Sequence, residues 1–143
     1  MKKETLWSLR LGFTSKQEVA IGKLGIKSFL EYSFKAISDQ TDPVFFSEIP
    51  KTLADINALK HKKRIASPQG KQEINNQQDA ISLAMQTWWI EKMINDEFPL
   101  REKMTCFWHN HFVATSQSVK VNYWIYQHNQ ILRNQAFGNY KTL

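Results

Sequence analysis

Cysteine is nearly absent from this chain, which has only Cys106 among its 143 residues. A single cysteine cannot form an internal disulfide, so the sequence gives no sign of an oxidising compartment. Long hydrophobic runs are also absent, and no segment approaches the roughly 20 apolar residues that a membrane-spanning helix requires. The sequence therefore predicts neither an internal disulfide nor a membrane span.

The N-terminus lacks a convincing export signal. Its short basic start is followed by Glu4, Ser8 and Arg10, which interrupt any apolar segment. A signal peptide needs an uninterrupted apolar region at this point. Read literally, the N-terminus predicts a cytoplasmic chain.

Familiar catalytic and nucleotide-binding motifs are missing as well. The chain contains no GxxxxGK[ST], GxGxxG, HExxH or GxSxG pattern. The carboxylates form no obvious pair. The sequence thus holds no complete catalytic motif, indicates no particular cofactor and leaves open whether the protein is an enzyme.

Apolar and aromatic residues are plentiful, at 42% and 13% of the chain, and they favour a real core over disorder. Period-two alternation is nowhere sustained, so we expect no strands. We predict a single all-α domain over residues 1–143, an irregular bundle of about six helices. The expected helices span residues 5–11, 15–25, 26–37 and 51–60, then about Gln72–Asn95, Pro99–Thr115 and Val121–Phe137.

Two local signals refine this prediction. Ser15 and Glu18 have the spacing of a capping box, which predicts a helix start. The segment Ser67–Gln72 holds both Pro68 and Gly70 and is the best loop candidate. We expect a mobile loop there. It would separate a weaker N-terminal helical part from the three main helices.

The helix expected at Gln72–Asn95 has two apolar faces, which is typical of a central helix. At about 100° per residue, one face gathers four side chains and the opposite face gathers three. The first face holds Ile74, Ile81, Met85 and Trp88, and the second holds Leu83, Ile90 and Ile94.

The helix at Pro99–Thr115 carries the candidate site residues. On a helical wheel His111 lies within the apolar arc and Arg101 at its edge, so both need buried hydrogen-bond partners. His109 shares the polar arc with Glu102, and the two form a candidate acid–base pair if another element covers them. Side chains at i and i+2 diverge on a helix, so His109 and His111 cannot both ligate one metal ion. We therefore predict no metal site.

The last helix also points polar groups inward, because His128 and Gln135 fall on its apolar arc. An antiparallel hairpin of the last two helices would allow a buried His111–His128 neighbourhood. A structural network that fixes helix register is the main alternative to catalysis there. Arg101, Lys103, His111, His128 and Gln135 are therefore candidate binding residues.

Basic residues are scattered except in Leu59–Arg64, and the formal net charge is +6. This segment has two interpretations: a nucleic-acid contact surface, or a solvated helix end, where Lys and Arg favour the last turn. The cations concerned are Lys60, Lys62, Lys63 and Arg64.

The string PLREKMTCFWHNHFVATSQSVK, with WWIEKM before it and NQILRNQAFGNY after it, resembles the bacterial family called domain of unknown function 1800. The opening LWSLRLGF is similar to the family's first motif, while the middle of the chain shows no likeness. The family has no settled activity to transfer. Its recurring positions correspond here to Arg101, Glu102, Lys103, Trp108, His109, His111 and Phe112.

The resemblance implies that this chain is the N-terminal portion of a longer protein, since members are usually much longer and many look exported. We therefore predict a helical scaffold that contributes part of a site completed by missing C-terminal residues. Helices that face the missing part would expose an apolar patch, through which the chain could self-associate. The alternatives are an interaction module for protein or nucleic acid, and a metal-dependent hydrolase in the full-length protein.

Overall fold

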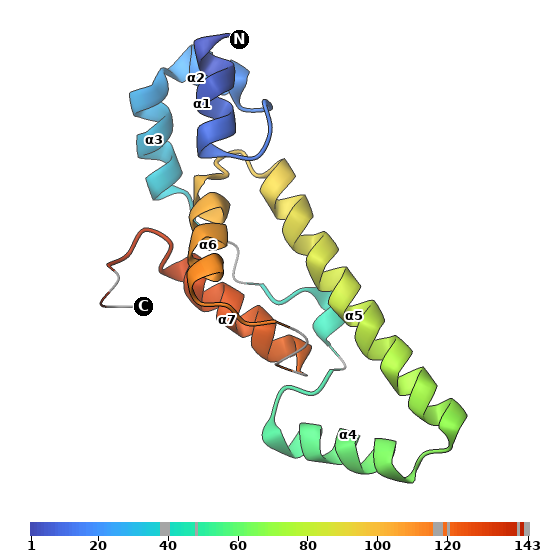
Figure 1. Ribbon diagram of the computed structural model, residues 1–143. Helices are drawn as coiled ribbons and strands as arrows, with labels where there is room; N and C mark the ends of the chain where they lie inside the picture. The colour runs from blue at the N-terminus through green and yellow to red at the C-terminus, as the bar shows by residue number, and fades with distance from the viewer. Residues whose placement is uncertain (38–40, 48, 116–118, 120, 140, 142–143) are drawn as a thin grey trace. The chain divides into compact units, whose positions relative to one another are not determined.

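The computed structural model describes residues 1–37, 41–47, 49–115, 119, 121–139 and 141. Over these residues the chain forms seven α-helices and one 3-10 helix, η1, with no strand (Figure 1). The predicted all-α class is confirmed. In chain order the elements are α1 Lys3–Leu11, α2 Glu18–Leu24, α3 Ile26–Lys35, η1 Val44–Phe46, α4 Leu53–Ile65, α5 Pro68–Asn95, α6 Leu100–His111 and α7 Asn122–Asn134.

The helices are distributed over two compact units. Unit 1 comprises Met1–Asp39, Trp88–Val113 and Asn129–Leu143, and unit 2 comprises Gln40–Thr87 and Ala114–His128. Both α5 and α7 contribute residues to each unit. The division does not fall at residues 67–72, where the sequence predicts a break.

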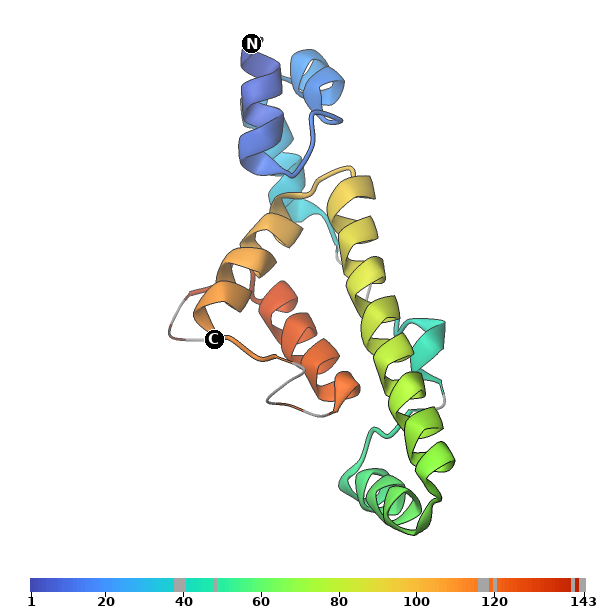
Figure 2. The same cartoon turned by 45° about the vertical axis from the view of Figure 1, so that its right-hand side comes forward.

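Unit 1 begins with three short helices, α1 to α3, that lie side by side (Figure 2). Gly25 ends α2 with a φ of 77°, a left-handed conformation that glycine adopts without steric cost. The predicted capping box at Ser15 and Glu18 is wrong, because α2 has no side-chain cap. The Glu18 carboxylate instead accepts a hydrogen bond from Thr5 Oγ1 at 2.8 Å, which ties α2 to α1.

Aromatic contacts supply much of the core of unit 1. Phe29 on α3 is fully buried, and its ring lies 5.4 Å from that of Phe98, just before α6. Phe34 meets Phe137 edge to face at 4.9 Å. Large rings dominate burial energetics. These two contacts therefore hold α3 against the residues just before α6 and just after α7.

Unit 2 is organised around η1, whose Phe46 is fully buried. Its ring lies 4.7 Å from Tyr126 and 5.7 Å from Tyr123, both on α7. The next helix, α4, starts with a capping box that the sequence reading missed: Thr52 and Asp55 each accept a hydrogen bond from the other's backbone N–H.

The predicted loop at Ser67–Gln72 is wrong, because α5 begins at Pro68. The Ser67 hydroxyl accepts a hydrogen bond from Gly70 N–H at 3.2 Å, as an N-cap does. Pro68 takes the first helical position, where the missing N–H costs nothing and the fixed φ favours the helix. Serine followed by proline therefore marks a helix start here.

The two apolar faces of α5 differ in exposure. Ile74 on the first face is buried, whereas Leu83, Ile90 and Ile94 on the second face are all exposed. The prediction of a central helix is therefore wrong for the second face. Within the described residues, no helix combines the length and the apolarity that crossing a membrane requires.

Candidate functional site

Three consecutive side chains anchor helix α6 within unit 1. Arg101, Glu102 and Lys103 point to three different neighbours, since successive side chains on a helix diverge by about 100°. Their partners lie on α7, at the ends of α1 and α3, and on α5. The helix is thereby fixed in rotation as well as in position.

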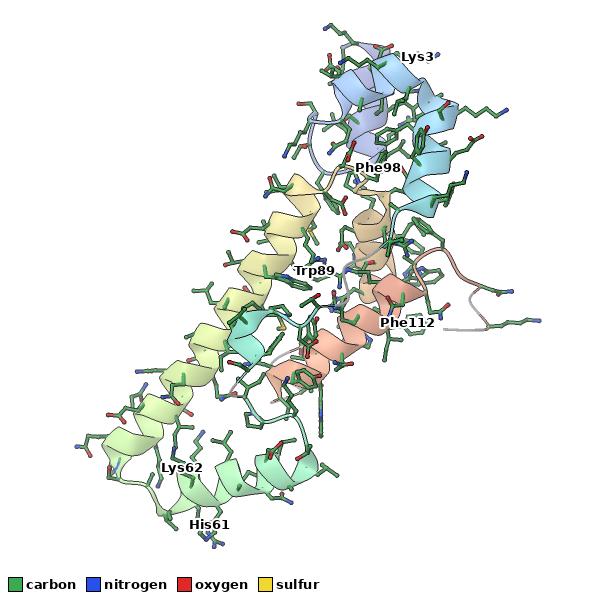
Figure 3. All side chains as sticks on the ribbon, turned by 180° about the vertical axis from the view of Figure 1, so that it is seen from behind. Lys3, His61, Lys62, Trp89, Phe98 and Phe112 are labelled. Atoms are coloured by element: carbon green, nitrogen blue, oxygen red, sulfur yellow. The ribbon has the colours of Figure 1, made fainter. Side chains whose placement is uncertain are left out.

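Glu102 forms a buried, two-point ion pair with Arg133 of α7. Arg133 Nε lies 2.6 Å from Glu102 Oε1, and Nη2 lies 2.9 Å from Oε2. Trp89 Nε1 donates a further hydrogen bond to Oε2 at 3.0 Å, reaching from α5 toward α6 (Figure 3). Arg133 is 0% exposed and Glu102 is also buried. Both carboxylate oxygens are thus already committed to donors within the fold.

Two further side chains complete the set of partners around Arg133. Its Nη1 donates to Gln130 Oε1, one turn earlier on α7. The guanidinium carbon also lies 5.2 Å from the centre of the Trp88 ring, a cation–π arrangement. A buried charge is tolerated when its partners satisfy it this fully, and removing one partner leaves an uncompensated charge. Glu102 and Arg133 therefore hold α6 and α7 together in one register.

Arg101 finds the acceptors that its place on the wheel predicted. It donates to the backbone oxygens of Ala36, at 2.9 Å, and of Arg133, at 3.2 Å. The guanidinium lies 4.8 Å from the centre of the Phe137 ring. Burial lowers the pKa of Arg101 below its ordinary value, and the nearby Glu102 charge opposes this shift. Arg101 thus links α6 to the end of α3 and to α7.

Lys103 holds the other side of α6 against the end of α1. Its Nζ donates to Gly12 O at 2.7 Å and to Leu9 O at 3.3 Å. Carbonyls in the last turn of a helix lack intrahelical partners, and a cation there is favourable. Gly12 is needed at this junction, because a Cβ there would lie 2.6 Å from Pro99 Cγ.

The two histidines of α6 differ in exposure, and the predicted burial of His111 is wrong. His111 is exposed rather than buried, and its Nδ1 lies 3.1 Å from Phe107 O in the preceding turn. The predicted buried His111–His128 neighbourhood is therefore wrong. His109 is half-buried, with its ring 5.2 Å from that of Trp89. Glu102 is covered rather than solvated, because Arg133 and Trp89 supply the donors that make its burial possible.

The candidates on the last helix are partly enclosed. His128 is half-buried in unit 2, and burial lowers the pKa of its imidazole below the ordinary value of 6.5. Gln135 is half-buried in unit 1. Their use in binding stays a prediction.

The comparisons with known proteins give one match. A family model described as Protein of unknown function (DUF1800) matches residues 5–143. The chain belongs to this family. The match includes the middle of the chain, where the sequence reading found no likeness. No curated protein and no solved structure matches the chain.

Within this DUF1800 chain, the sequence reading missed the residue at the centre of the anchoring network, Arg133. Trp124 and Ile131 of α7 are exposed, whereas its buried residues include four polar ones. A signal for this polar side was present in the spacing of those residues. Asn122, Asn129 and Arg133 are separated by seven and four residues and so share one face.

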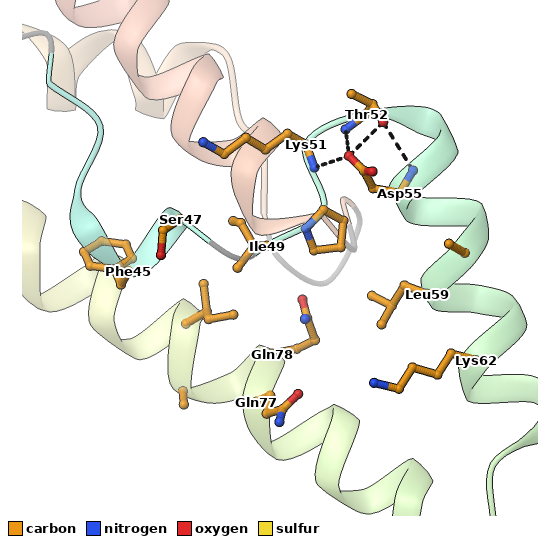
Figure 4. Close-up of a pocket in the computed structure, with 14 residues that line it drawn as sticks. Phe45, Ser47, Ile49, Lys51, Thr52, Asp55, Leu59, Lys62, Gln77 and Gln78 are labelled. Atoms are coloured by element: carbon orange, nitrogen blue, oxygen red, sulfur yellow. Dashed lines mark hydrogen bonds between the residues drawn. The ribbon is translucent and has the colours of Figure 1, made fainter.

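The basic segment Leu59–Arg64 of this DUF1800 chain forms the last turns of α4, as the helix-end interpretation predicts. Its five polar residues, from Lys60 to Arg64, are all exposed. They do not form one flat surface. His61 projects from α4 away from α5 (Figure 3), whereas Lys62 extends toward α5 (Figure 4).

In the part of the DUF1800 chain that the structure describes, no group of three or more His, Cys, Asp or Glu side chains could hold a metal ion. Cys106 is half-buried on α6 and forms no disulfide.

Proposed function

We propose that this chain is a helical scaffold that presents the last turn of α6 as one part of a site, which polypeptide outside these 143 residues completes. In this proposal Arg101, Glu102 and Lys103 are positioning residues. His109 and His111 are the groups presented. A functional group needs such support, because its geometry is only as good as the packing and hydrogen bonds behind it.

The observation that carries the proposal is the contrast between the two ends of α6. Three side chains near its start make hydrogen bonds to backbone or side chains of four other segments. Near its end, Phe107 is 46% exposed, and Asn110 and His111 are also exposed. The Phe107 and His111 rings lie 4.5 Å apart and together form an aromatic and titratable surface.

The experiment measures how readily diethyl pyrocarbonate acylates each histidine. It compares the 143-residue chain with the product of the full reading frame. We expect His111 to react in the 143-residue chain and to become protected in the longer polypeptide. His61 is an internal control, because it is exposed on α4 and belongs to the other unit. Equal His111 reactivity in both polypeptides contradicts the proposal.

A second candidate function, nucleic-acid binding through Leu59–Arg64, has one observation in its favour: the exposure of Lys60, Lys62, Lys63 and Arg64. Phosphate contacts release counterions, so the affinity for generic DNA or RNA would fall steeply with salt. Titration at low and moderate ionic strength tests this. An absence of binding at low salt removes the candidate.

A further inference from the structure

Unit 2 contains two neighbouring concave sites on α4 and α5. The wider one, drawn in Figure 4, has Lys62 and the Thr52–Asp55 capping box on its wall. The narrower one has a volume of about 490 Å³. Small-molecule sites commonly measure roughly 300–1,000 Å³, so the narrower cavity has the size of a ligand site.

The wall of the narrower cavity is mainly aliphatic. Ile56 of α4 and Ile74 of α5 are buried, while Leu53 is 68% exposed and Trp124 of α7 is 41% exposed. An apolar ligand in the cavity would remove such surface from water, at about 25 cal/mol for each Å². Two of the lining residues are joined by a hydrogen bond from Asn122 Nδ2 to Gln78 O at 2.9 Å.

Among the described residues that line this cavity, the charges all have one sign. Lys60 and Lys63 are the charged ones in that set, and both side chains are exposed. Lys63 Nζ donates to the neutral oxygen Asn75 Oδ1, which leaves its charge uncompensated. Among the described residues, neither lysine forms an ion pair. The cavity therefore offers an aliphatic interior beside two uncompensated cations.

We propose that this cavity binds a small amphipathic anion, with its apolar body against Ile56, Ile74 and Trp124 and its carboxylate against Lys60 and Lys63. A linear monocarboxylate of medium chain length has both parts. Charge-assisted hydrogen bonds from the ammonium groups hold the head. Burial of the chain supplies most of the affinity.

The test is calorimetric titration of the 143-residue chain with decanoate below the concentration at which it forms micelles. Decanol has a comparable apolar body without the charge, and acetate has the charge without the body. We expect saturable binding of decanoate, about tenfold weaker binding of decanol, and no measurable binding of acetate. An absence of saturable decanoate binding, or equal affinity for decanol, overturns the proposal.

Matched variants separate the two cavity lysines from the rest of the basic segment. Lys60→Gln with Lys63→Gln should weaken decanoate binding about tenfold and leave decanol binding unchanged. The control pair, Lys62→Gln with Arg64→Gln, removes the same charge from the same helix but from side chains outside this cavity. Equal losses in both pairs overturn the proposal, because they indicate a diffuse charge effect.

A second readout locates the ligand. Trp124 is the only tryptophan that lines the cavity. Decanoate with a terminal bromine should quench the fluorescence of the wild-type chain, and Trp124→Phe should abolish most of that quenching. Undiminished quenching in Trp124→Phe places the ligand elsewhere and overturns the proposal. Thermal unfolding followed by circular dichroism verifies that every variant is folded.

Discussion

The two units place their charged side chains differently. Unit 1 encloses an ion pair, Glu102 with Arg133, and surrounds it with directional partners. Among the described residues of unit 2 no charged side chain is buried, and the buried side chains include Phe46, Ile56 and Ile74, which pack by non-directional apolar contacts. Directional bonds fix the orientation of α6 in unit 1, whereas the apolar walls of unit 2 enclose a cavity of about 490 Å³.

The largest effect should come from breaking the ion pair in unit 1. Glu102→Ala leaves the buried Arg133 charge uncompensated and should lower the free energy of unfolding by about 3–5 kcal/mol. Urea denaturation measures this loss. The double variant Glu102→Leu with Arg133→Met removes both charges and should recover most of the stability. A single-variant loss below about 1 kcal/mol would show that the pair is not effectively buried.

A smaller effect is expected from truncation of the apolar wall in unit 2. Ile74→Ala should cost about 2 kcal/mol, the low end for such a change, because the adjoining cavity is already open. The exposed Leu83 on the same helix is the control, and Leu83→Ala should cost less than about 0.5 kcal/mol. The same urea experiment measures both. An Ile74→Ala cost above about 4 kcal/mol would mean that unit 2 is as tightly determined as unit 1.

Two asparagines on α7 test whether a buried polar group stabilises the fold only when it has a hydrogen-bond partner. The amide atoms of Asn129 are buried without a hydrogen-bond partner among the described residues, whereas Asn122 donates to Gln78 O. Replacing an unsatisfied group removes a penalty, and replacing a satisfied one orphans its partner. Asn129→Leu should therefore raise stability by about 1 kcal/mol and Asn122→Leu lower it by about 1 kcal/mol. If both substitutions changed the free energy of unfolding in the same direction, this explanation would be refuted.

The smallest effect is a pH dependence in unit 2. Burial lowers the pKa of His128 below 6.5, so the unfolded chain takes up a proton there before the folded chain does. Stability from the neutral imidazole is complete above about pH 6.5 and is lost as pH falls toward the lowered folded-state value. The Tm of the wild type should thus fall more between pH 7 and pH 5.5 than that of His128→Gln. If Tm fell equally with pH in the wild type and in His128→Gln, His128 would not contribute to the pH dependence of stability.

Helix identity and order followed from local chemistry. Gly12 and Gly25 end α1 and α2 where the sequence predicts, and Pro99 precedes α6. The misplaced loop at Ser67–Gln72 came from weighing Pro68 and Gly70 as breakers. Ser67 as an N-cap reverses that interpretation, and this signal was already present in the sequence.

Burial of the candidate site residues could not be predicted from the wheel. A helical wheel assumes that charged side chains face water. This assumption fails where another helix supplies an opposite charge for a buried ion pair. Glu102 and Arg133 are 31 residues apart, and neither has a local reason to be buried. Once each is buried, the polar face of α6 turns inward and His111 turns outward.

By itself, the sequence determined the all-α class, the family, and the position of the three main helices, because periodicity and capping act within a few residues. It also determined that Arg101 needs a buried acceptor. Only the tertiary structure decided that Glu102 anchors α6, that His111 is exposed and that Lys60 and Lys63 line a cavity. These properties depend on pairings between distant segments, since a buried charge is stable only where the fold supplies its partner.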